Sequence, residues 1–125
     1  MKTTILYTRK QIAAIIGVTP NQMRGWEKHP RLFMLPKNGR KQIHRQDFLT
    51  ALNRVHHGGG GVTAIPDAML SQKELLAYYE IGWGKLATWT ANGLPRFVFT
   101  KRMLRYDVAE VEVWYLNTYG SRRPS

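Results

Sequence analysis

The sequence repeats itself on either side of four consecutive glycines at positions 58–61. A shift of 63 positions brings residues of the same kind together in the same order: Thr8 and Ser71, Lys10 and Lys73, Ala14 and Ala77, and Trp26 and Trp89. After the tryptophans the first copy carries about four extra residues, around 31–34, before a Leu-Pro pair recurs at 35–36 and 94–95. A glycine run is costly inside a helix or strand. We therefore predict a module at residues 1–56, a Gly-rich flexible linker at 57–66, a second module at 67–119 and a basic tail at 120–125.

Each copy begins with the signals of two short helices. Thr8 and Ser71 are good N-cap residues, and each has Gln or Glu three positions later, which predicts a capping box. Gly17, with Glu80 as its counterpart, ends the first helix, and Thr19-Pro20 is a typical start for the second. Apolar residues at helical spacing predict the buried faces: Ile12, Ile15, Ile16, Met23 and Trp26 in the first copy, and Leu75, Leu76, Tyr79, Leu86 and Trp89 in the second.

A hairpin and a third helix follow in each copy. Asn38-Gly39 predicts a two-residue hairpin turn, and 97–99 with 103–104 predict two strands around 100–102. Asp47 and Asp107 are expected to open the last helices, whose apolar stripes are Phe48, Ala51, Leu52 and Val55, and Val108, Val111 and Tyr115. The sequence thus predicts a mostly α fold with small β wings, as two tandem winged helix-turn-helix modules.

The formal net charge of +11 favours a polyanionic partner, either nucleic acid or, as the alternative, an anionic membrane surface. No apolar run approaches the ~20 residues of a membrane-spanning helix, and no signal peptide is evident. We expect no membrane association and a bacterial cytoplasmic, nucleoid-associated protein. There is no cysteine, which excludes disulfides and thiolate zinc sites. His56-His57 is interpreted as a helix end with no carboxylate nearby, and the acids are dispersed, so we predict no enzyme activity, no cofactor and no metal site.

Several runs resemble a known family. TRKQIAAIIGVTPNQMRGWE is similar to the opening of the MerR-type winged helix, and LSQKELLAYY, LATWTANGLP and RYDVAEVEVW resemble its excisionase-like (AlpA-like) form. The resemblance covers nearly the whole chain in two copies. It implies that the second helix of each copy enters the major groove, at 20–28 and 84–90, and that wings at 37–41 and 100–102 touch the backbone or minor groove. The first copy departs from the Gly-Leu-Pro turn, and Gly84 weakens the start of the second reading helix.

The candidate DNA-contacting residues follow from these assignments. The first reading helix offers Pro20, Asn21, Gln22, Arg24 and Lys28, the second offers Gly84, Lys85, Thr88 and Thr90, and the wings offer Lys37, Asn38, Arg40, Lys41, Thr100, Lys101 and Arg102. Arg24 suits guanine, while Asn21 and Gln22 suit adenine. All three could instead be solvated surface residues. Wing cations are expected to bind phosphates, which position a protein without reading sequence.

These residues predict sequence-specific binding of double-stranded DNA by a small phage or mobile-element protein. The first hypothesis is an excisionase-like recombination directionality factor, whose partners would be an integrase or recombinase and other copies of itself on DNA. The alternatives are a transcriptional regulator of a phage or mobile element and a DNA-recognition component of phage packaging.

Overall fold

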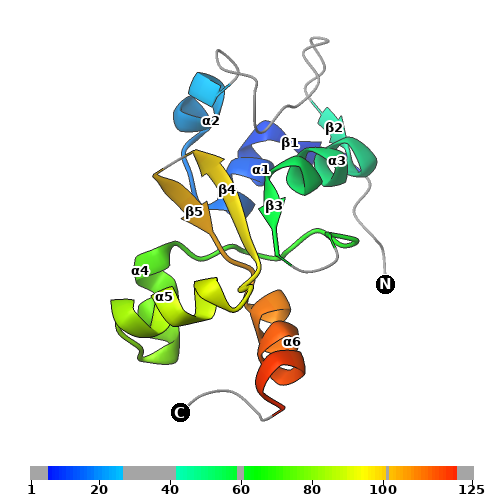
Figure 1. Ribbon diagram of the computed structural model, residues 1–125. Coiled ribbons are helices and arrows are strands. Elements are labelled where there is room, and N and C mark those ends of the chain that lie inside the picture. The colour runs from blue at the N-terminus through cyan, green and yellow to red at the C-terminus, as the bar shows by residue number, and fades with distance from the viewer. Residues whose placement is uncertain (1–5, 27–41, 59–60, 101, 121–125) are drawn as a thin grey trace.

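The computed structural model describes residues 6–26, 42–58, 61–100 and 102–120, with the helix but not the side chains at 24–26. Within these residues the chain is mixed α/β, with six helices and two small antiparallel sheets (Figure 1). This agrees with the predicted helices and small β elements. In chain order they are β1 (Leu6–Thr8), α1 (Arg9–Ile16), α2 (Pro20–Trp26), β2 (Gln42–His44), α3 (Arg45–Val55), β3 (His56–His57), α4 (Gln72–Tyr79), α5 (Trp83–Ala91), β4 (Arg96–Thr100), β5 (Met103–Arg105) and α6 (Val108–Tyr119).

The internal repeat is present in the order and spacing of these elements. Helices α1, α2 and α3 begin at 9, 20 and 45, and α4, α5 and α6 begin 63 positions later, at 72, 83 and 108. The pairing of Tyr7 with Ile43 recurs as an isolated bridge between Leu70 and Tyr106. Both copies therefore bring the residues before their first and third helices together.

Local caps define the helix ends much as the sequence indicates. Thr8 Oγ1 accepts from the Gln11 amide at 3.1 Å while Gln11 Oε1 accepts from the Thr8 amide at 2.8 Å. Ser71 and Glu74 form the same reciprocal pair. Gly17 ends α1 in the left-handed conformation, with φ 84°. Asp107 is the N-cap of α6, whereas Asp47 lies in the first turn of α3, whose N-cap is His44 with Nδ1 accepting from the Gln46 amide.

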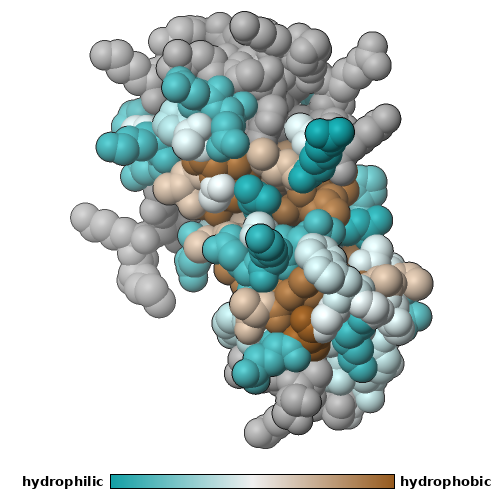
Figure 2. Space-filling view, turned by 90° about the vertical axis from the view of Figure 1, so that its left-hand side faces the viewer, coloured by the Kyte–Doolittle hydropathy of each residue, from teal (hydrophilic) through white to brown (hydrophobic). Residues whose placement is uncertain are grey.

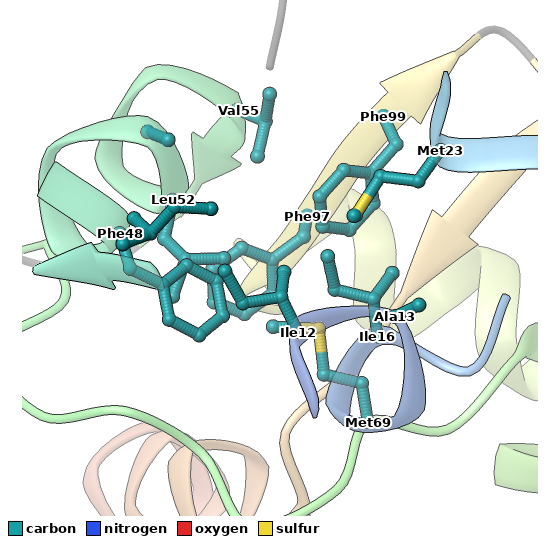
Figure 3. Packing of buried hydrophobic residues seen from close by; sticks show 12 residues of the cluster. Ile12, Ala13, Ile16, Met23, Phe48, Leu52, Val55, Met69, Phe97 and Phe99 are labelled. Atoms are coloured by element: carbon teal, nitrogen blue, oxygen red, sulfur yellow. The ribbon is translucent and has the colours of Figure 1, made fainter. Parts of the chain in front are cut away.

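The first hydrophobic cluster draws on both copies (Figure 3). Its members from the first copy include the predicted apolar residues of α1, α2 and α3: Ile12, Ile16, Met23, Phe48, Ala51, Leu52 and Val55. Met69, Phe97 and Phe99, all from beyond the glycine run, complete it. The prediction of a self-contained module at 1–56 is therefore wrong, because part of its core is supplied by the second copy.

The second cluster belongs to the second copy alone. Trp89 is fully buried at its centre, as predicted, and its ring meets Tyr79, Trp114 and Tyr115 with centroids 5.6–5.7 Å apart. The other buried members are Leu75, Leu86, Leu94, Tyr106 and Val111. Edge-to-face aromatic packing of this kind adds to the stabilisation from buried area.

The described part of the predicted linker is packed rather than free. His57 pairs with Arg96 in the sheet β3–β4–β5. A Cβ at Gly58 would lie 2.8 Å from the Gly93 carbonyl oxygen, so the chain here passes close to the second copy. The Asn53 side chain exchanges two hydrogen bonds with Val62, at 2.8 and 2.9 Å, and Pro66 is buried. The linker prediction is wrong for these residues, while Gly59 and Gly60 lie outside the described part.

A partly buried ionisable pair also joins the two copies. His56 Nε2 lies 2.8 Å from Glu110 Oε2, with the side chains 4% and 23% exposed. The same imidazole packs edge-on against Phe97. The expectation that no carboxylate lies near His56 is therefore wrong, because α6 brings one from the other copy.

Candidate nucleic-acid interface

The first candidate surface is α2, which follows α1 after a tight turn. The amides of Gly17 and Val18 both donate to the Ala13 carbonyl, at 2.8 and 2.9 Å, which closes the end of α1. Met23 is 2% exposed and fixes the inner side of α2 in the first cluster. Asn21 and Gln22 are exposed on the other side. The structure here thus consists of two short helices joined by a tight turn, with exposed polar residues on the second.

Gln22 has a structural role that the sequence analysis missed. Its Oε1 accepts from the Thr19 amide at 2.9 Å, while its own amide donates to Thr19 Oγ1 at 3.1 Å. This is the reciprocal arrangement of a capping box. Recognition of adenine through both groups of the side-chain amide needs that oxygen free. In this conformation the Nε2 group is the end of the Gln22 side-chain amide that takes no part in the cap.

Several predicted contacts lie beyond what the structure describes. They are the side chain of Arg24, together with Lys28, Lys37, Asn38, Arg40, Lys41 and Lys101. Pro20 is described and exposed, and it is the first residue of α2, where its missing N–H leaves no helical hydrogen bond unmade.

The second candidate surface is α5, which the structure forms differently from α2. Its N-cap is Gly82, without a side-chain cap bond, and Trp83 is 57% exposed where the first copy has proline. Gly84, Lys85 and Thr88 are exposed, as a reading surface requires. Lys85 is the one cation in α5, as Arg24 is the one cation in α2, so the two helices themselves carry equal charge.

The two threonines of α5 are not equivalent. Thr90 is half-buried, and its hydroxyl donates to the Leu86 carbonyl at 2.8 Å. Thr88 is exposed, and its hydroxyl donates to the Gly84 carbonyl at 3.1 Å. A side chain that already bonds its own helix and faces inward cannot reach a base edge. The structure therefore places Thr88 on the outer side of α5 and Thr90 away from it.

The hairpin of β4 and β5 extends away from α5 toward its tip (Figure 1), although Leu104 of β5 packs against the second cluster. Phe99, next to the tip, belongs to the first cluster together with Met23 of α2, and the two side chains lie close together in Figure 3. The hairpin end points toward α2 in Figure 1. At the tip Thr100 is half-buried and Arg102 is exposed, and the Arg102 amide donates to Thr100 Oγ1 at 3.3 Å.

Arg105 is the most informative residue that the sequence analysis did not identify. Its Nε donates to the Ile16 carbonyl at 2.8 Å and its Nη2 to the Gly17 carbonyl at 3.2 Å. Burial lowers the pKa of Arg105, and the nearby Glu74 carboxylate opposes that shift. The side chain thus caps the C-terminal end of α1, where a cation is favourable. Its partners lie 88 and 89 positions earlier in the chain, so no local pattern could indicate them.

Positive charge is concentrated in the first half of the sequence. Residues 1–63 hold eleven Lys and Arg against two Asp and Glu, a net +9, whereas residues 64–125 hold eight against six, a net +2. Figure 2 shows the side of the molecule that lies on the left in Figure 1, where hydrophobic residues reach the surface in patches with hydrophilic residues between and around them. A polyanion would therefore meet most of the basic residues at the first copy.

The described residues contain no group of three or more His and acidic side chains able to hold a metal ion. None of the helices described is both long and apolar enough to cross a bilayer.

No protein-family model, curated protein or solved structure matches this chain.

Proposed function

We propose that this protein is a small, non-enzymatic, sequence-specific binder of double-stranded DNA, with a helix-turn-helix in each repeat. The observation that carries the proposal is the α1–α2 pair: a capped turn, a buried Met23 and an exposed polar side on α2, within the half of the chain that holds +9. A helix presented in this way fits the major groove, where each base pair displays its own donors and acceptors.

We assign different roles to the side chains of α2 according to the hydrogen-bonding groups that each can present to DNA. Asn21 is exposed and able to pair with adenine, and Arg24 has the donors for guanine O6 and N7. Gln22 contributes chiefly by holding the start of the helix. Five further cations fall at 27–41, namely Lys28, Arg31, Lys37, Arg40 and Lys41, and we assign them to phosphates, as in the predicted first wing.

The second repeat would make a weaker contact through α5, using Gly84, Lys85 and Thr88. Helices α2 and α5 lie toward the same side of the molecule, at its upper and lower ends in Figure 1. Their amino-acid sequences differ, so the proposed DNA site has two unlike parts. Because β3 pairs with β4 and both copies share a core, the proposed spacing between these parts is fixed instead of adjustable by a loose linker.

Selection from a library of random duplexes tests this proposal. We expect the wild-type chain to enrich one sequence motif. Arg24→Ala should then lose about 1–3 kcal/mol on that motif and relax preference at one base pair. Lys73→Ala, which removes one exposed positive charge from α4, is the matched control and should keep the motif. Failure of the wild-type chain to enrich any motif would contradict sequence-specific binding.

For the biological role we propose an excisionase-like recombination directionality factor that acts in a bacterial cytoplasm with an integrase or recombinase. The support is the resemblance of its sequence runs to MerR-type and excisionase-like winged helices, together with its small size and charge. A transcriptional regulator and a packaging component are the alternatives. An excision assay with purified recombinase separates them: stimulation by this protein supports the first role, and unchanged excision contradicts it.

A further inference from the structure

The β4–β5 hairpin belongs to the second repeat by sequence but packs into the first. Phe97 and Phe99 are 1% and 2% exposed within the cluster that holds Met23 of α2, and Met103 packs against that cluster. On the opposite face Leu104 contacts the second cluster. The hairpin therefore cannot follow α5 as an independent wing, because its buried side is committed to the core beneath α2.

Hydrogen bonds fix the hairpin against the turn that leads into α2. Arg105, the last residue of β5, donates to the carbonyls of Ile16 and Gly17 at 2.8 and 3.2 Å. Close by, the Met69 amide donates to the Ile15 carbonyl at 2.8 Å. Three successive carbonyls at the end of α1 are thus bonded to the second repeat, and the position of the hairpin relative to α2 is set by these bonds as well as by packing.

The tip of the hairpin carries an available cation. Arg102 is exposed, and within the described residues its side chain makes no ion pair. A guanidinium presented at the surface can bind phosphate through two donors. Thr100, whose hydroxyl accepts from the Arg102 amide, holds the tip in a compact turn.

We propose that this hairpin acts as a wing for α2, so that Asn21 and Arg102, from different repeats, contact one continuous segment of duplex DNA. Arg102 would hold a phosphate next to the bases that α2 reads. This inference rests on the proposed DNA binding, and it changes which residues form a single contact surface.

Cysteine-directed cleavage tests this arrangement, because the sequence contains no cysteine of its own. An iron–EDTA chelate attached to Asn21→Cys, Arg102→Cys or Lys85→Cys would cut the DNA backbone near each position. We expect the cuts from positions 21 and 102 to overlap within one turn of the selected duplex, and those from position 85 to fall elsewhere. Cuts from 102 that coincide with those from 85 would overturn the proposal.

Binding measurements on unlabelled variants give an independent readout. Arg102→Ala should weaken binding on all sequences alike and reduce the slope of log affinity against log salt by about one, and Arg102→Lys should restore the slope. Lys73→Ala is the control with the same loss of charge. If the wild-type chain binds duplex DNA and Arg102→Ala binds it equally tightly, the hairpin assignment is overturned but the proposed function is not. Absence of duplex binding by the wild-type chain would overturn this inference and the proposed function together.

Discussion

Neighbouring exposed side chains of α2 have different roles, one in helix capping and one in the proposed base contact, and Gln22 has the first. Its side-chain amide has the groups to read adenine, and in the structure it caps α2 through Thr19. We predict that Gln22→Ala lowers the free energy of unfolding by about 0.3–1.5 kcal/mol and weakens DNA binding equally on all sequences. Asn21→Ala should instead relax base preference with little loss of stability. Urea titrations and binding to single-base variants of the selected duplex would measure both effects, and a base-specific loss in Gln22→Ala would contradict the capping role.

Asp107 provides a second residue-scale prediction, through its pKa. Burial raises the pKa of this carboxyl, hydrogen bonding from the Ala109 amide opposes the shift, and Glu110 and Asp67 add to it. Because the folded pKa lies above the unfolded one, the folded chain holds this proton more tightly. The contribution of Asp107 to stability is thus present at low pH and is lost as pH rises through the folded pKa.

Asn caps helices as well as Asp does but carries no charge. Asp107→Asn should therefore gain stability relative to wild type as pH rises through that window, and the difference should then level off. Asp107→Ala loses the cap and should cost about 0.5–2 kcal/mol. Chemical denaturation across acidic to neutral pH would measure both variants. A wild-type advantage over Asp107→Asn that grows with pH would contradict the direction of the shift.

At the scale of elements, the hairpin is where local prediction and structure differ most. Its strands were predicted correctly, because alternation of Phe97, Val98 and Phe99 is a local signal. The residues against which the hairpin packs were not predicted, because the sequence of a strand does not indicate which distant hydrophobic cluster its buried face will join. The helices and caps were predictable for the converse reason: Thr8, Ser71 and Gly17 act on residues within one turn.

The location of Phe97 gives a stability prediction that distinguishes a packed hairpin from a free wing. Phe97→Ala should lower the free energy of unfolding by about 3–5 kcal/mol, as expected for a large side chain removed from a core. Val113→Ala, at a side chain 58% exposed on α6, is the control and should change it by about 0.5 kcal/mol or less. Urea titrations would provide the comparison, and a similarly small effect for Phe97→Ala would show that the hairpin is not part of the core.

At the scale of the whole molecule, the repeats are duplicated in layout but joined in packing. The glycine run suggested separable modules, yet β3 pairs with β4 and His56 meets Glu110 across the two copies. A composition signal such as four glycines indicates local freedom of the chain and does not report tertiary contacts.

Positive charge is distributed unevenly over the molecule, with +9 in residues 1–63 and +2 in the rest. We therefore expect the molecule to meet DNA as one body, with the first repeat making most phosphate contacts.

The dependence of binding on salt, measured on the selected duplex and on a scrambled duplex of equal length, tests this account most directly. If about eight cations meet phosphates, log affinity should fall with log salt at a slope of about −7. The selected duplex should also remain tighter than the scrambled one by about 10³-fold or more at physiological salt. A slope near zero, or equal affinity for the two duplexes, would contradict the account.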